Sequence, residues 1–170
     1  MGWKNRESPD SFNIYERQLI DIYESSITNV PQQIFDHLTQ EVIKEYKNQV
    51  YVYTRKLIKN IKSKKYFILA ISGSHHELIG NMATEYGFDD YVGSKYERSG
   101  TNFSGASTIV SLNKASALQK MIDAHNLTLS GSYAIGDSAS DISMLKMVNN
   151  PIAFCANFKT FPLNCIFLSI

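Results

Sequence analysis

The stretch that decides the fold class is Ala134-Ile135-Gly136-Asp137-Ser138-Ala139-Ser140-Asp141. Tyr133 to Ile135 form an apolar run of strand length, and Gly136 allows a tight turn directly after it. Asp137 is therefore expected at the carboxyl end of a strand, which is where open α/β sheets bind ligands. The residues from Asp141 to Val148 have helical periodicity, so Asp141 is expected in the first turn of a helix.

The carboxylates of Asp137 and Asp141 are expected to face the same edge of the sheet. Paired carboxylates on a loop suit Mg²⁺, which binds through one or two protein carboxylates, waters and substrate phosphate oxygens. The sequence therefore predicts a magnesium site with Asp137 and Asp141 as its ligands. The ordinary alternative is an aspartate that caps a helix beside an αβ turn. The rest of the chain favours the metal site.

Composition limits the classes of partner. The 170 residues, 44% of them hydrophobic, suit one domain with a small subdomain, and the formal net charge of +1 gives no reason to expect a nucleic acid or a membrane as partner. Cys155 and Cys165 are too few for a disulfide framework or a cysteine metal site, so a reducing, cytoplasmic location is expected. No apolar run reaches the roughly 18 residues of a membrane helix. The oligomeric state is left open.

The first part of the chain carries only helical signals. One apolar set with spacings of three and four begins at Phe12, and after Pro31 a second set contains Ile34, Leu38, Val42 and Tyr46. A third helix is predicted from Val50 to Ile61. Residues 1–62 are therefore expected to form a helical portion, whose tyrosines either line a substrate pocket or pack between helices; packing is favoured.

The period changes at Tyr66, where Tyr66 to Ile71 form a continuous apolar run that predicts a buried strand. Ser72, Gly73 and Ser74 follow, and then a helix. Ser72 is expected at the end of the strand, with the Gly73 and Ser74 amides at the start of the helix, which is an arrangement that binds anions. The alternative is that Ser72 merely caps the helix.

Lys114 opens a further predicted helix. A lysine at a helix start is unfavourable for the helix dipole, so Lys114 is expected to compensate a nearby negative charge. Between these segments, Ser99-Gly100-Thr101-Asn102 predicts a hairpin turn, and after Asp141 the run from Pro151 to Phe154 predicts another strand. The fold class predicted from these elements is α/β, a Rossmann-like parallel sheet flanked by helices, with the core in residues 63–170.

Taken in order, Ser72 after a strand, Lys114 opening a helix and Gly136-Asp137-Ser138 with Asp141 resemble motifs two, three and four of the haloacid dehalogenase superfamily. The phosphoserine-phosphatase-like branch is the most similar. The resemblance runs from about Tyr51 to Phe154 and implies that the helices before it belong to a cap. It further implies a phosphatase that hydrolyses a small phosphorylated metabolite through an aspartyl-phosphate. Ser72, Gly73 and Lys114 would hold the phosphoryl group, and Lys114 would take part in catalysis. Asp137 and Asp141 would form the Mg²⁺ site, with Asp137 as a ligand and Asp141 orienting the metal's shell or binding through water.

The motif that supplies the attacking carboxylate in this superfamily is Asp-x-Asp after the first strand, and this sequence contains no Asp-x-Asp. We therefore expect a chain that is incomplete at its N-terminus and lacks the central strand of the sheet, with the apolar segment from Cys165 to Ile170 as a candidate to fill the gap. Two other readings stay open. One is a catalytically inactive phosphate- and metal-binding or regulatory module, and the other is a Rossmann-like domain with accidental motifs.

Overall fold

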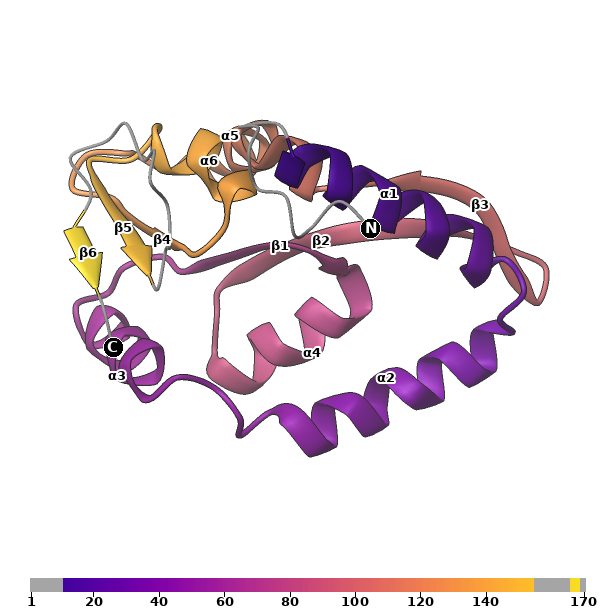
Figure 1. Cartoon of the computed structure of the whole chain (residues 1–170). Coiled ribbons are helices and arrows are strands. Elements are labelled where there is room, and N and C mark those ends of the chain that lie inside the picture. Colours follow the sequence, from indigo (N-terminus) through magenta and orange to yellow (C-terminus); the bar gives the residue numbers. More distant parts are fainter. Residues whose placement is uncertain (1–10, 155–165, 169–170) are drawn as a thin grey trace. The chain divides into compact units, whose positions relative to one another are not determined.

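The computed structural model describes residues 11–154 and 166–168, with side chains described from residue 14 to residue 154. The helices are α1 (Ser11–Ile27), α2 (Gln32–Tyr46), α3 (Val52–Ser63), α4 (His76–Tyr86), α5 (Lys114–His125) and α6 (Ile142–Leu145). The strands are β1 (Leu69–His75), β2 (Asp90–Ser99), β3 (Asn102–Thr108), β4 (Tyr133–Gly136), β5 (Asn150–Phe154) and β6 (Ile166–Leu168) (Figure 1). Short 3₁₀ turns precede α5 and α6: η2 (Ser111–Asn113) and η3 (Ala139–Asp141).

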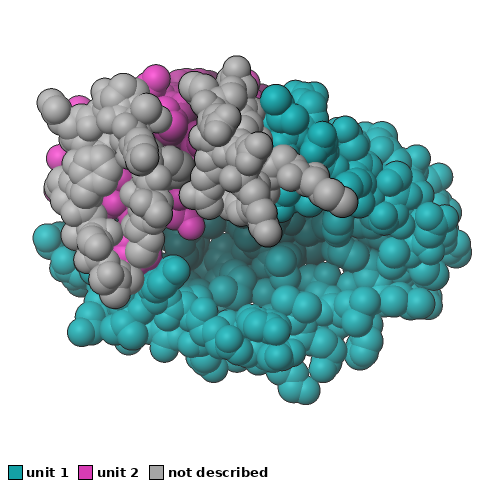
Figure 2. Space-filling view, in the orientation of Figure 1, with its two compact units in different colours: residues 1–110 teal, residues 111–170 magenta. Residues whose placement is uncertain are grey.

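The chain divides into two compact units, Met1–Val110 and Ser111–Ile170 (Figure 2). The first unit contains the three N-terminal helices together with β1, α4 and the β2–β3 hairpin, and the second contains the elements from η2 onward. This division differs from the predicted boundary between residues 62 and 63. The helical cap over residues 1–62 stays a prediction.

In the first unit, three strands pair in the order β1-β2-β3. β1 and β2 are parallel, with Ile71 opposite Val92, and β2 and β3 are antiparallel around the predicted turn, where Gly100 has a φ of 57°. Helix α4 packs on β1 and β2, α1 packs on β3, and α2 packs on α4 (Figure 1). β1, α4 and β2 thus form a parallel crossover, of which the sequence predicted the first strand and the helix after it.

The strand before Ser72 begins later and ends later than predicted. Tyr66 lies in the turn that caps the C-terminal end of α3. Lys65 adopts a left-handed conformation there (φ 61°), and the Tyr66 amide donates a hydrogen bond to the Ile61 carbonyl. The strand then runs from Leu69 to His75. Its pairing with β2 shifts register between Ile71 and His75, so that Ser72 lies within an irregular part of the strand.

Helix α2 forms where predicted but does not bury the predicted stripe. Ile34, Leu38, Val42 and Tyr46 are all exposed, whereas Thr39 is buried and the ring of Phe35 meets that of Phe103 on β3 edge to face. The stripe that faces inward is therefore one residue further along the helix. On the same helix, Asp36 is paired with Arg98 on β2.

In the second unit, three parallel strands pair in the order β4-β5-β6, with Ile135 opposite Ile152 and Ala153 opposite Phe167. α6 packs on β4 and α5 packs on α6. The apolar tail does supply a strand, β6, but this strand pairs with β5, and no described strand pairs with β4 on its other edge. The prediction that the tail fills the gap between the Ser72 and Asp137 strands is therefore wrong. The remaining tail residues (165, 169 and 170) lie outside the described residues.

The hydrophobic core of the second unit centres on Leu145, which has no exposed surface, and includes Leu118, Met144, Ile152, Ala153 and Phe154. Among the described residues, no helix combines the length and the apolar character needed to cross a membrane.

The first prediction concerns this core. Replacement of Leu145 by alanine is expected to lower the free energy of unfolding by about 2–5 kcal/mol, because it removes buried methyl groups and leaves a cavity. Leu112→Ala is the matched control, since Leu112 is 46% exposed and its loss is expected to cost less than about 0.5 kcal/mol. Urea denaturation of both variants measures the difference, and equal effects would contradict this placement of the core.

Candidate functional site

The loop after β4 is shaped by the close approach of Asp141 to Gly136. A Cβ atom at position 136 would lie 2.5 Å from Asp141 Cβ and 2.7 Å from its Cγ. Real atoms do not approach so closely, so no other residue fits at Gly136 without moving the aspartate. The glycine that the sequence pattern indicates is thus required by packing of the second carboxylate over the end of the strand.

One oxygen of Asp141 holds the loop in place. Its Oδ2 atom accepts hydrogen bonds from the Asp137 amide (3.1 Å), the Ser138 amide (2.9 Å) and the Ser138 hydroxyl (2.8 Å). Ser138 and Asp141 form a capping box around η3. The spacing Ser-x-x-Asp is typical of this arrangement, and it is the sequence signal that could have identified Ser138.

The other oxygen of Asp141 binds Lys114. Lys114 Nζ lies 2.5 Å from Asp141 Oδ1, and both residues are buried, with 8% and 4% of their surface exposed. Lys114 is the first residue of α5, where the Asn113 side chain caps the helix by accepting a hydrogen bond from the Ser116 amide (3.0 Å). The negative charge expected near Lys114 is therefore that of Asp141.

Opposing effects act on the pKa of Asp141. Burial is the largest effect and raises the pKa, but the hydrogen bond and the charge of Lys114, together with the Ser138 hydrogen bonds, outweigh it. The net pKa lies below the usual aspartate value, so the residue is a carboxylate at neutral pH. Its oxygens are already engaged by donors from Lys114, Asp137 and Ser138, which leaves little capacity to ligate a metal directly.

Asp137 differs from Asp141 in each of these respects. Its side chain is exposed at the end of β4, and the carboxylate makes no hydrogen bond or ion pair with the described residues. The described part of the chain contains no group of three or more His, Cys, Asp or Glu side chains that could hold a metal ion. A hard carboxylate donor with free oxygens fits Mg²⁺, which needs only one or two protein carboxylates when waters and substrate complete its shell.

Ser72 and Gly73 lie in the first unit, on β1. The Ser72 hydroxyl oxygen accepts a hydrogen bond from the Ser74 amide (3.1 Å), and the Gly73 carbonyl accepts one from the buried Ser94 hydroxyl (2.7 Å). Because α4 begins only at His76, the Gly73 and Ser74 amides do not form the start of that helix. The predicted anion cradle at the helix N-terminus is therefore wrong in this detail. What the structure does show is that residues 72–74 are held by these two hydrogen bonds and carry the Ser72 hydroxyl.

The structure thus brings together three of the predicted site residues, Lys114, Asp137 and Asp141, around one loop of the second unit. The position of Ser72 and Gly73 relative to that loop stays a prediction. Ser94, which fixes Gly73, could not be found from the sequence because nothing in its local pattern marks it.

The family model for haloacid dehalogenase-like hydrolases matches residues 10–146 of this chain. The chain belongs to this family. The resemblance inferred from Ser72, Lys114 and the segment from Gly136 to Asp141 is therefore confirmed.

Known relatives support the same branch of the family. The phosphoserine phosphatase of Lactococcus lactis is 26% identical over 133 residues, which cover 76% of this chain and 59% of that protein. A solved substrate-bound phosphoserine phosphatase complex is 27% identical, with a TM-score of 0.52, and the match covers 60% of this chain and 50% of that one. This chain therefore spans between half and three-fifths of the length of these two relatives.

A solved phosphoserine phosphatase in its apo form has a TM-score of 0.63 to this chain and is 20% identical, over 87% of this chain and 72% of that one. At this identity the match shows the fold alone. It confirms the predicted fold class, α/β with a parallel sheet flanked by helices.

The second prediction concerns the buried ion pair. Asp141→Asn is expected to lower the free energy of unfolding by about 3–5 kcal/mol, because it leaves the Lys114 ammonium buried without a charge partner. Glu41→Gln serves as the control, since it breaks the exposed Lys44–Glu41 pair and is expected to cost less than about 1 kcal/mol. Denaturant unfolding of the two variants measures both values. A loss at Asp141 no larger than that at Glu41 would show that the pair is not buried.

Proposed function

We propose that this chain belongs to a phosphatase that hydrolyses a small phosphomonoester with the help of Mg²⁺, and that the residues present here hold the phosphoryl group and the metal. The phosphoserine phosphatase relatives support a phosphomonoester as the substrate class.

The observation that carries the proposal is the contrast between the carboxylates of Asp141 and Asp137. Asp141 is buried and bound to Lys114, whereas Asp137 is exposed and has free oxygens at the end of β4. In this arrangement Asp141 can position the lysine and the bound cation, while the Asp137 carboxylate is available to bind a ligand. A simple helix cap would need only the Ser138–Asp141 contacts and would not bury a lysine beside them.

Each residue then has a defined role. The Lys114 ammonium has three N–H donors, of which one is directed to Asp141, so the others can donate to phosphoryl oxygens. The Ser72 hydroxyl accepts from the Ser74 amide and keeps its own proton for a phosphoryl oxygen. Asp137 would hold Mg²⁺, which when bound neutralises charge on the phosphoryl oxygens. Asp141 orients Lys114 and, through its hydrogen bond to the Asp137 amide, the loop that carries Asp137.

A second candidate function is a phosphate- and metal-binding module without turnover. One observation favours it: the 170 residues contain no Asp-x-Asp, the motif that would supply the attacking carboxylate. Both candidates share the same binding residues and differ only in whether a nucleophile is available. Metal-dependent turnover of a phosphomonoester by this chain, above the level of an Asp137→Ala variant, would favour the enzyme, and binding without turnover would favour the module. The cytoplasmic location stays a prediction.

The third prediction tests the metal assignment. Calorimetric titration of Mg²⁺ in the presence of inorganic phosphate is expected to show weak binding that Asp137→Asn abolishes. Asp141→Asn is expected to weaken binding by about tenfold, because it only orients the site. Asp123→Asn, which changes an exposed carboxylate on α5, is the control and should bind as the unaltered chain does. A larger loss at Asp141 than at Asp137, or no phosphate-dependent binding at all, would contradict the proposed site.

A further inference from the structure

His75, the last residue of β1, is enclosed by aromatic rings in the first unit and is only 7% exposed. Its imidazole stacks on Tyr96 of β2 at 4.3 Å between ring centroids and lies 4.2 Å from Phe35 of α2. Tyr23 of α1 and Phe103 of β3 complete the enclosure at 5.9 and 6.0 Å. Four elements thus pack around one ionisable ring.

The two nitrogens of this imidazole have different surroundings. Nδ1 lies 2.9 Å from a Glu77 carboxylate oxygen, and because a carboxylate can only accept, Nδ1 carries the proton. Nε2 is buried and has no hydrogen-bond partner among the described residues. The neutral ring fits this environment, whereas a protonated ring would bury an N–H group that has no acceptor.

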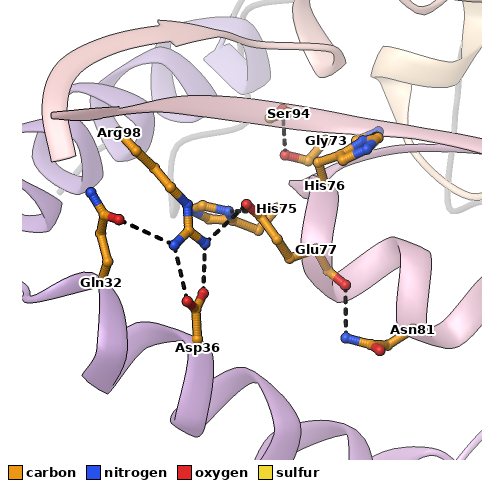
Figure 3. A network of polar contacts seen from close by, with 10 residues as sticks. Gln32, Asp36, Gly73, His75, His76, Glu77, Asn81, Ser94 and Arg98 are labelled. Carbon is orange, nitrogen blue, oxygen red and sulfur yellow. Dashed lines mark hydrogen bonds and ion pairs between the residues drawn. The ribbon is translucent and has the colours of Figure 1, made fainter. Parts of the chain in front are cut away.

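Glu77 of α4 connects the imidazole to a cluster of polar side chains from four elements, α2, β1, α4 and β2 (Figure 3). Arg98 of β2 makes two hydrogen bonds to the Asp36 carboxylate on α2, at 3.0 and 2.5 Å, and a third to the other oxygen of Glu77 at 3.3 Å. Gln32 of α2 accepts a further hydrogen bond from Arg98 at 3.4 Å. We call Gln32, Asp36, His75, Glu77 and Arg98 the Arg98 cluster.

The start of α2 is also tied directly to the hairpin between β2 and β3. The Gln32 amide donates to the Thr101 carbonyl (2.9 Å), and the Gln32 side chain donates to the Gly100 and Asn102 carbonyls. Phe35, one turn further along, contacts both His75 and Phe103. The position of α2 against the hairpin therefore depends on the same small region as the imidazole.

We propose that His75 is an acid-sensitive latch that holds α2 against the β2–β3 hairpin and releases it when Nε2 becomes protonated. A protonated ring reaches water only by leaving the aromatic enclosure. Its departure removes the ring that contacts both Phe35 of α2 and Tyr96 of the hairpin, and it takes away the partner of the Glu77 carboxylate. This inference is independent of the proposed phosphatase function, because it concerns only contacts within Met1–Val110.

The groups that face His75 restrict the pH at which the latch opens. Burial lowers the pKa of His75 below about 6.5, the charges of Arg98 and His76 lower it further, and Glu77 partly opposes them. The carboxylates of Glu77 and Asp36 have lowered pKa values, and the phenols of Tyr23 and Tyr96 have raised ones, that of Tyr96 to about 12. His76 also has a lowered pKa, through burial first and then Lys95, but its ring stacks on Tyr91 outside the cluster.

The direction of the effect follows from these shifts. A released imidazole binds a proton near pH 6.5, whereas the enclosed one does so only at lower pH. The closed form is therefore fully favoured above pH 6.5 and loses stability as the pH falls below that value, by up to about tenfold in the opening equilibrium per pH unit for one proton.

Hydrogen exchange at the Gln32 amide tests the latch in the full chain, because this amide donates to the hairpin carbonyl of Thr101. After correction for the intrinsic rate, its protection is expected to fall by up to about fivefold between pH 6.5 and 5.5. The fall is expected to disappear in His75→Phe, which keeps an aromatic ring and cannot titrate. It is expected to persist in His76→Phe, the matched control at the neighbouring position.

A second measurement on the unaltered chain keeps the test decisive if His75→Phe does not fold. The imidazole signal of His75 in an NMR titration is expected to report a pKa below 6.5, with Gln32 protection changing over the same pH range. The proposal is overturned if His75 titrates at or above 6.5, if Gln32 protection does not change with pH, or if the change follows His76.

Discussion

The buried ion pair between Lys114 and Asp141 is the contact on which the candidate site depends. Two opposite charges removed from water must stay together, because either one alone would carry a desolvation penalty of several kcal/mol. The pair fixes the first residue of α5 to the loop after β4, and Gly136 provides the space in which Asp141 can fold back. Asp141 thereby becomes a structural carboxylate, and Asp137, one residue beyond the strand, is left exposed.

Most of this loop could be predicted from the sequence because its signals are local. An apolar run followed by glycine and aspartate predicts a strand end, and an unfavourably placed lysine at a helix start indicates a nearby negative charge. The sequence could not show which carboxylate meets that lysine. The choice depends on a contact between residues 27 positions apart, and only the structure shows that Asp141 takes this role and that Ser138 supports it.

The predictions that were wrong depended on contacts between distant segments or on a helix end that the apolar pattern does not mark. The apolar stripe of α2 indicates a helix correctly, but the side that packs inward is the one that carries Phe35, which contacts His75 and Phe103. The strand before Ser72 starts late because the C-terminal end of α3 extends to Tyr66. Lys65 is left-handed there, and the Tyr66 amide donates to the Ile61 carbonyl. β6 pairs with β5 and not with β4, and no local signal in the apolar tail specifies which edge of the sheet it joins.

The central claim is that Asp137 binds the metal while Asp141 stays with Lys114, and a crystal of this chain grown with Mn²⁺ and inorganic phosphate tests it most directly. Mn²⁺ substitutes for Mg²⁺ at oxygen ligands and can be located by its anomalous scattering. We expect an anomalous peak at bonding distance from an Asp137 oxygen, with Asp141 Oδ1 still hydrogen-bonded to Lys114 Nζ. A peak bonded to Asp141, with Lys114 displaced from it, would contradict the claim.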